Sequence, residues 1–232
     1  MTSLKKAALA GLCSLAVFSV GTAHATPLIS LGLSQDASTP ATIATDSGTG
    51  SLSFNQAFGT FSDVNVSATG VPLVPQATFE STSIDTKSTQ GGAQTLYIWI
   101  TAQGLTQPAS VANFLSGFTA NIFSGNVSSV TETTYISATN QLFGGVQQAT
   151  ETFMSAPSSA SVVSVSPNLS GGPFSETEEY IIHLFGAGSA NDSINMQAVP
   201  EPASMALLGL GMIGTGVVAR RRRQSATTPT AC

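Results

Sequence analysis

The amino-acid sequence predicts an all-β protein, with an antiparallel, sandwich-like body between an N-terminal signal peptide and a C-terminal transmembrane helix. Three observations predict the fold of the body. Short segments of alternating apolar and polar residues recur along it, with Gly, Asn or Pro between them. No stretch of the body has the sustained 3.6-residue periodicity of an amphipathic helix. Many short strands at regular spacing are typical of an antiparallel sandwich.

The strongest strand pattern lies in the segment TLYIWIT. Leu96, Ile98 and Ile100 face one way in an extended strand, and Tyr97 and Trp99 face the other. Because both faces are apolar, we expect a central strand. The remaining predicted strands cover residues 60–67, 76–85, 118–123, 127–138, 146–153, 161–166, 174–185 and 193–198.

Glycine, proline and asparagine mark the predicted connections. Ser124-Gly125-Asn126 is expected to form a hairpin turn, and Gly171-Gly172-Pro173 is expected to turn the chain into the following strand. Residues 34–50 and 154–160 are predicted to be long loops, and residues 107–115 allow a short helix of about two turns.

Residues 1–25 have the three parts of a secretory signal peptide. Lys5 and Lys6 give a positively charged start, and an apolar run follows them. Ala23 and Ala25 are the small residues that a signal peptidase requires. The sequence therefore predicts export across the inner membrane, with cleavage directly after Ala25.

A second targeting segment covers residues 199–223 and joins a proline-rich motif, an uncharged run and a basic cluster. The motif is Val199, Pro200, Glu201 and Pro202, and the cluster is Arg220, Arg221, Arg222 and Arg223. Residues 203–219 would span roughly 26 Å as a helix, just enough to cross a bilayer. Arginine favours the cytoplasmic side, so the prolines are expected at the outer face, where they keep the motif extended. On these residues alone, a permanent anchor explains the segment equally well.

In this fixed order, the motif, the apolar helix and the arginines resemble the PEP-CTERM sorting signal. That signal marks the substrates of exosortase, a membrane-embedded processing enzyme of Gram-negative bacteria that produce exopolysaccharide. The resemblance is confined to residues 199–223. It implies an exosortase-like partner, membrane attachment through the helix before processing, and delivery of the body to the cell surface or extracellular matrix. Residues 224–232 form a short tail beyond the point where such chains usually stop.

Between the two signals, residues 26–198 have the length of one domain. This body has eleven acidic residues and one basic residue, Lys87, which leave a net charge near −10. Such a charge excludes nucleic acid as a partner, because nucleic acid binding requires clustered Lys and Arg. Cys13 and Cys232 lie outside the body, so we predict no disulfide and no cysteine metal site in it. No metal and no cofactor are predicted.

The acidic residues of the body include one candidate catalytic pair. Glu176, Glu178 and Glu179 form the densest group of carboxylates. Glu176 and Glu178 share one face of a strand at roughly 7 Å, a separation that suits an inverting glycosidase. Charged alternation on a strand more often marks a solvated face, and His183, the one histidine of the body, is expected to be structural. We therefore predict that the protein is not an enzyme.

The prediction is a secreted surface protein with a structural or adhesive role in an exopolysaccharide or biofilm matrix. Two alternatives stay open: a carbohydrate-binding module in which Tyr97 and Trp99 stack on the ligand, and a secreted polysaccharide hydrolase. An exposed Trp99 beside a groove would favour binding, and two carboxylates across a cleft would favour hydrolysis.

Overall fold

A computed structural model describes residues 26–36, 40–46, 48–71, 78–170 and 172–199. The predicted signal peptide, membrane helix, sorting motif after Val199 and C-terminal tail lie outside these residues. Within the described ranges, no helix has the length and apolar character that a membrane crossing requires.

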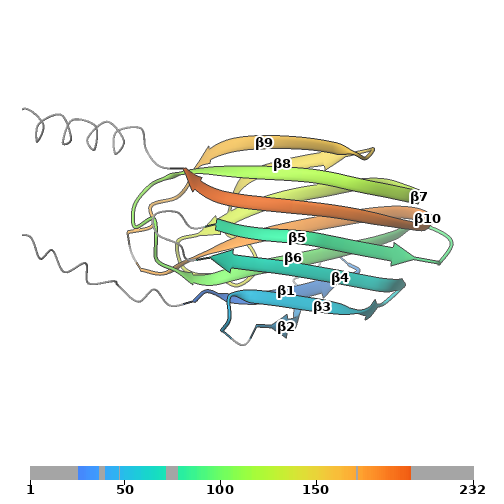
Figure 1. The fold of residues 1–232 in the computed structure, drawn as a ribbon, viewed down its shortest axis with the longest axis horizontal. Coiled ribbons are helices and arrows are strands. Elements are labelled where there is room, and N and C mark those ends of the chain that lie inside the picture. Colours follow the sequence, from blue (N-terminus) through green and yellow to red (C-terminus); the bar gives the residue numbers. More distant parts are fainter. Residues whose placement is uncertain (1–25, 37–39, 47, 72–77, 171, 200–232) are drawn as a thin grey trace, which may run out of the picture.

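The described part of the chain folds into ten strands, and every pair of neighbouring strands is antiparallel (Figure 1). The prediction of an all-β, antiparallel body is therefore confirmed. The strands are β1 (Leu28–Ser34), β2 (Ala41–Thr45), β3 (Ser51–Phe58), β4 (Phe61–Val71), β5 (Thr78–Ser88), β6 (Gln94–Leu105), β7 (Asn113–Ser137), β8 (Val146–Phe153), β9 (Ser158–Val165) and β10 (Phe174–Val199).

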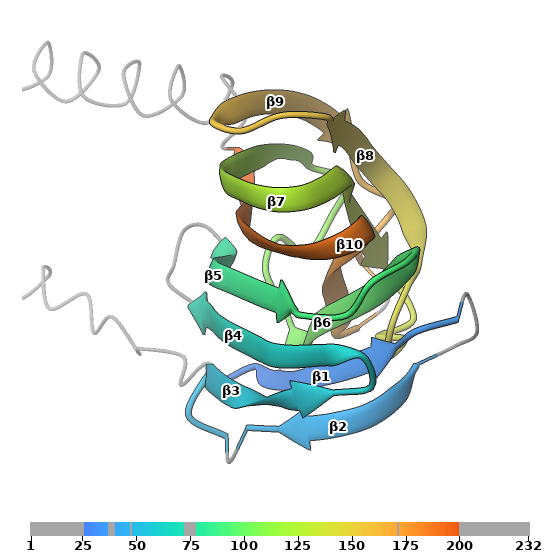
Figure 2. The ribbon, with the colours of Figure 1, turned by 90° about the vertical axis from the view of Figure 1, so that its right-hand side faces the viewer.

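Two long strands, β7 and β10, pair with each other along most of their length and join two layers of sheet (Figure 2). The first half of β10 pairs with β6, and its second half pairs with β5. The first layer therefore has the order β2-β1-β6-β10-β7-β8, and the second has the order β3-β4-β5-β10-β7-β9. Side chains meet between the layers, as in the 2.8 Å hydrogen bond between the hydroxyls of Ser116 and Thr134.

The predicted hairpin turn at Ser124-Gly125-Asn126 is wrong, because the chain continues through it as β7. Residues on both sides of Gly125 pair with the same neighbour, β10, and Gly125 itself lies opposite Gly188. Both long strands change layer here, and their backbones come very close. A Cβ on Gly125, whose φ is +71°, would lie 2.5 Å from the carbonyl oxygen of Ala187. Glycine thus allows a bend between layers at this point.

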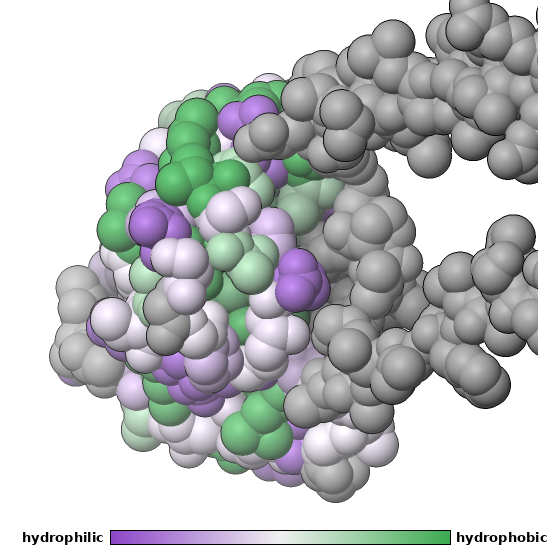
Figure 3. Space-filling model, turned by 90° about the vertical axis from the view of Figure 1, so that its left-hand side faces the viewer, coloured by the Kyte–Doolittle hydropathy of each residue, from purple (hydrophilic) through white to green (hydrophobic). Residues whose placement is uncertain are grey.

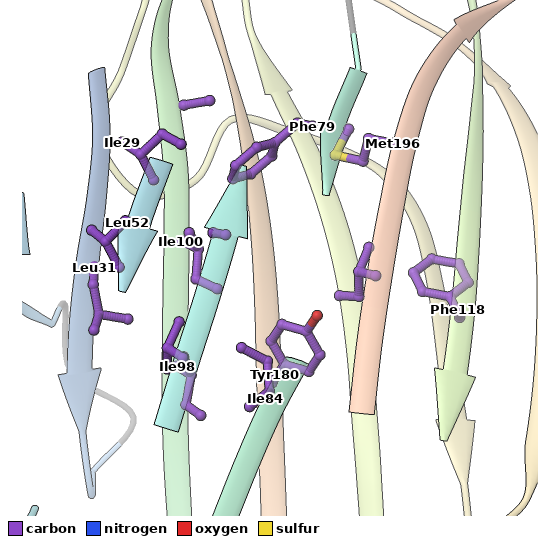
Figure 4. Packing of buried hydrophobic residues seen from close by; sticks show 14 of the residues in the cluster. Ile29, Leu31, Leu52, Phe79, Ile84, Ile98, Ile100, Phe118, Tyr180 and Met196 are labelled. Atoms are coloured by element: carbon purple, nitrogen blue, oxygen red, sulfur yellow. The ribbon is translucent and has the colours of Figure 1, made fainter. Parts of the chain in front are cut away.

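The core lies between the two layers, where the inward-facing side chains of both meet (Figure 4). Burying one Ile, Leu or Phe side chain stabilises a fold by about 1.5–3 kcal/mol, so this set provides the main stabilising term. The largest fully buried side chains are Tyr180, Phe61, Phe79, Phe114, Phe118, Phe174, Ile29, Leu31, Ile84, Leu96, Ile98 and Ile100. Strand β6 lies between β1 and β10, as expected for a central strand.

Several segments differ from the sequence-based expectation. Strands β1 to β3 were not predicted, and β2 lies inside the expected loop 34–50. Strand β2 is almost wholly exposed and forms by pairing with β1, so it carries no alternating signal of its own. Residues 107–115 contain no helix, and β9 begins within the expected loop 154–160.

The two predicted strands 174–185 and 193–198 are parts of the single strand β10. Pairing with β7 stops after Leu184 and resumes at Gly188, so the two strands pair on both sides of the bend although the glycines suggested a break.

Candidate functional site

The outward-facing side of the first layer carries a cluster of aromatic side chains from neighbouring strands. Tyr97 and Trp99 come from β6, Glu179 comes from β10 directly opposite Trp99, and Tyr135 comes from β7. The rings of Trp99 and Tyr135 stack across β10, with centroids 5.8 Å apart and planes at 26°. We call these four residues the aromatic face; its three aromatic side chains are partly exposed.

A short hydrogen bond ties the aromatic face to a carboxylate. The Tyr135 hydroxyl donates to Oε2 of Glu179 at 2.6 Å. Burial raises the pKa of Glu179, and this hydrogen bond opposes the rise. Burial, followed by the hydrogen bond and the charge of Glu179, raises the pKa of Tyr135, so the phenol keeps its proton and remains the donor.

The indole N–H of Trp99 is buried and has no hydrogen-bond acceptor among the described residues. Any contact that a ligand makes with Trp99 therefore involves the face of the ring and not the indole N–H.

A loop borders the aromatic face at one end. The backbone N–H of Phe143 donates to the Thr101 hydroxyl at 3.2 Å, and the N–H of Gly144 lies 3.3 Å from the Thr177 hydroxyl, which accepts from it. The two hydroxyls also bond to each other at 2.9 Å. These contacts hold the loop over the outer side of β6 and β10 and limit the face there.

At the other end of the same outer side lies His183, with its Nδ1 atom 3.0 Å from the Thr95 hydroxyl. Phe185 follows on β10 and is 71% exposed. No acidic side chain among the described residues hydrogen-bonds to His183, so the described contacts contain no Ser-His-Asp arrangement.

The aromatic face has the composition of a site for a flat, partly apolar ligand rich in hydroxyl groups. Stacked aromatic rings offer a rigid apolar surface, and a neighbouring carboxylate accepts hydrogen bonds from hydroxyls at its edge. Tyr97 and Trp99 lie where the sequence predicted, on the side opposite Ile98. Tyr135 and Glu179 were not predicted for this site, because only the position of β10 between β6 and β7 brings them to Trp99.

The predicted solvated position of Glu176 and Glu178 is wrong. Both side chains point into the core beside Tyr180 and have no exposed surface. All four of their carboxyl oxygens lack a hydrogen-bond partner among the described residues. They cannot flank a substrate in a cleft. In the described part of the chain, no group of three or more His, Cys, Asp or Glu side chains is arranged to hold a metal ion.

Two further acids, Glu132 and Asp192, are buried in the same core. Glu132 Oε2 accepts a hydrogen bond from the backbone N–H of Thr119 at 3.1 Å, while its Oε1 and both oxygens of Asp192 have no described partner. We call Glu132, Glu176, Glu178 and Asp192 the inner acids.

Comparison with known proteins identifies the C-terminal segment. Residues 198–223 match the PEP-CTERM protein-sorting motif. The resemblance recognised in residues 199–223 is therefore confirmed for this segment. The motif implies export, processing by an exosortase and sorting to the cell surface. No curated protein matches the chain significantly.

Solved structures resemble the body only distantly. The carbohydrate-binding module TmCBM27, described for specific mannan recognition, has 6% identity and a TM-score of 0.32, covering 64% of this chain and 89% of its own. TmCBM61, solved with beta-1,4-galactotriose, has 8% identity and a TM-score of 0.30, covering 61% and 90%. The enzymatically active domain of bacteriophage CBA120 tailspike protein 4 has 10% identity and a TM-score of 0.28, covering 74% and 19%. Likenesses of this size carry no argument about this chain.

Proposed function

We propose that this exosortase-sorted surface protein is an adhesin of the extracellular matrix, and that its body binds a neutral polysaccharide through the aromatic face. The observation that carries the proposal is the stacked pair of Trp99 and Tyr135 on the outer side of the first layer. The sorting motif supports a location at the cell surface, where such a polymer would be met.

The charge of the body argues for a neutral polymer. Eleven acidic residues and one lysine between the two targeting segments repel anionic polysaccharides as they repel nucleic acid. Stacking on a sugar ring needs no ionic group on the ligand. Binding should therefore depend weakly on salt.

The proposal includes no catalysis. A glycosidase needs two carboxyl groups that flank the scissile bond, about 5–10 Å apart. The aromatic face offers one, Glu179, whose charge is already engaged by Tyr135. Glu176 and Glu178 lie on the other side of β10, within the core.

Affinity measurements on purified full-length protein in detergent test the binding. The ligands are three neutral polysaccharides, a β-glucan, a mannan and a galactan, compared by isothermal titration and affinity electrophoresis. Trp99→Ala and Tyr135→Ala should each weaken binding to the recognised polymer about tenfold or more, as expected for aromatic anchors. Val163→Ala removes an apolar side chain that is 62% exposed on the second layer, far from the aromatic face, and should leave binding unchanged. Equal affinity of wild type, Trp99→Ala and Tyr135→Ala for every polymer would refute the proposal.

The sorting step is tested separately in the cell. Replacing Pro200 and Pro202 with alanine should let the membrane helix extend outward, so that full-length protein stays in the membrane. Mass analysis of the released and membrane fractions reads the result. Release as efficient as that of the unaltered chain would show that the prolines are not recognised.

A further inference from the structure

A polar hollow of about 330 Å³ lies on the outer side of the second layer. Strands β4, β5, β7 and β10 form it near the bend of the two long strands. Its lining includes Asp63, Asn65, Asp85, Lys87, Ile122 and Asn191. Because the two layers face each other through the core, this polar hollow and the aromatic face open on opposite sides of the body.

The register of the strands pairs the polar groups of the hollow. Asp63 lies opposite Lys87, so an acidic and a basic residue are cross-strand neighbours. Asp85 lies between Asn65 on one neighbouring strand and Asn191 on the other, and the Asn191 amide donates to its Oδ1 at 2.5 Å. The two carboxylates and the one ammonium group of the lining leave the hollow with little net charge, so it does not need a bound ion to neutralise it.

Donors and acceptors alternate across the hollow, and this arrangement suits hydroxyl groups. A sugar hydroxyl both donates and accepts, so adjacent hydroxyls on one ring bond best where carboxylates stand beside amide and ammonium donors. Ile122, which is 62% exposed at the rim, offers an apolar surface to the C–H groups of the ring. The volume lies at the lower end of the range for small-molecule sites, which fits one or two sugar units.

We propose that the polar hollow is a second saccharide site, which takes a neutral sugar unit, and that the body thereby bridges two polysaccharide chains, one on each outer side. The bridging rests on the proposed function of the aromatic face, whereas sugar binding in the hollow does not. Stacked layers are about 10 Å apart, and the two sites open away from each other, so one short glycan cannot occupy both.

The first experiment measures sugar binding in the hollow independently of the aromatic face. D-Glucose, D-galactose and D-mannose are each titrated into purified full-length protein in detergent, and binding is followed by saturation-transfer NMR and calorimetry. The preferred hexose should bind the wild type, and Asp63→Ala and Asn65→Ala should each weaken it at least fivefold. Ser53→Ala, an exposed position on the outer side of β3 away from the lining, should bind as the wild type does. An unchanged thermal melt establishes that each variant is folded.

The second experiment tests the bridging with the polysaccharide that the aromatic face binds. Wild type should raise the viscosity of the polymer solution, and both Trp99→Ala and Asp63→Ala should abolish the rise. Trp99→Ala should still bind the hexose, which separates failure of the aromatic face from failure of the hollow.

The inference is overturned if no hexose binds, if Asp63→Ala and Asn65→Ala bind it as Ser53→Ala does, or if Asp63→Ala still raises the viscosity. Preference for glucosamine over all three neutral hexoses would also overturn it, because it would assign the hollow to a cation.

Discussion

Glu178 and Glu179 are neighbours on β10, yet they lie in opposite surroundings. Glu179 points to the outer side of the first layer and accepts a hydrogen bond from Tyr135. Glu178 points into the core, where neither of its oxygens has a hydrogen-bond partner among the described residues. In a strand, consecutive side chains must point to opposite faces, so a run of acids cannot keep all its members on one side. Since Glu179 is itself only 5% exposed, the comparison shows that charge alone does not tell which face of a strand lies in the core.

The other inner acids are buried like Glu178, and burial raises their pKa values. Burial first, and then the charge of Asp192, raises the pKa of Glu132 to about 9. Burial raises the pKa of Glu176 to about 8, and burial followed by the charge of Asp85 does the same for Asp192. The pKa of Glu178 is raised well above 4.5, mainly by burial and further by Glu176 and Glu132. The only lysine of the body, Lys87, is exposed on the outer side of the second layer. The core therefore favours the protonated form of these carboxyl groups.

The largest expected effect is that of pH on stability. The pKa values of the inner acids in the folded chain lie above those in the unfolded chain, which are 4.5 for Glu and 3.8 for Asp. The folded state therefore holds more protons between about pH 4 and pH 9, and its free energy of unfolding falls as pH rises through that window. The loss should be on the order of several kcal/mol, and the Tm should drop by more than about 10 °C between pH 5 and pH 9. Calorimetric melts of the full-length protein across this range measure it, and a Tm that rises with pH would contradict the account.

A smaller effect is expected when one inner acid is made permanently neutral. Glu178→Gln keeps the shape of a protonated carboxyl group but cannot ionise. At pH 9 the variant should be more stable than wild type by about 1–3 kcal/mol, and at pH 5 the two should differ little. Glu179→Gln, one residue along the strand, is the matched control and should flatten the pH profile much less. Equal profiles for the two variants would remove the distinction between the faces.

A third prediction concerns the hydrogen bond that Tyr135 donates to Glu179. Tyr135→Phe keeps the ring that stacks on Trp99 and removes the hydroxyl that bonds to Glu179. The loss of this hydrogen bond should lower the free energy of unfolding by about 1–2 kcal/mol at pH 7, as measured by denaturant titration. In the double variant with Glu179→Ala, which removes the acceptor, the two losses should not add, since each substitution alone removes the same bond. Additive losses would show that the bond contributes nothing.

The smallest expected effect concerns an exposed acid on the far side of the second layer. Glu80 contributes to the raised pKa of Glu178 through its charge, after burial and the nearer carboxylates. Glu80→Gln should leave the pH profile of Tm within error of wild type, because charges at an exposed position are screened by solvent. A clear flattening would mean that repulsion, rather than burial, keeps the inner acids protonated.

Part of this architecture could be predicted because it depends on local pattern. The boundaries of β8 match the predicted strand 146–153, and the two apolar faces of the TLYIWIT segment correctly indicated a central strand. The unbroken course of β7 and β10 could not be predicted, because glycines near Gly125 and Gly188 usually end strands. Here they permit a close approach of two backbones, and pairing of the two strands on both sides of the bend maintains the extended chain.

The candidate site also has features that the sequence pattern predicted and features that it did not. Alternation correctly separated Tyr97 and Trp99 from Ile98, and it grouped Glu176 and Glu178 on one face of their strand. It did not reveal that this face is the buried one. Nor did it bring Tyr135, 36 residues further along the chain, onto the ring of Trp99.

Contiguous residues specify both the alternation of side chains and the sorting segment, which was predicted at 199–223 and matched at 198–223, because neither depends on contacts between distant parts of the chain. Which side of β10 is covered depends on how the layers pack, and this packing places Glu178 in the core and Glu179 on the aromatic face. The physical reason is that both faces of a strand can be buried or exposed. The choice follows from the second layer, which packs on one side of the first and leaves the partly exposed aromatic face on the other side. Figure 3 shows one end of the body, where small polar and apolar areas lie side by side.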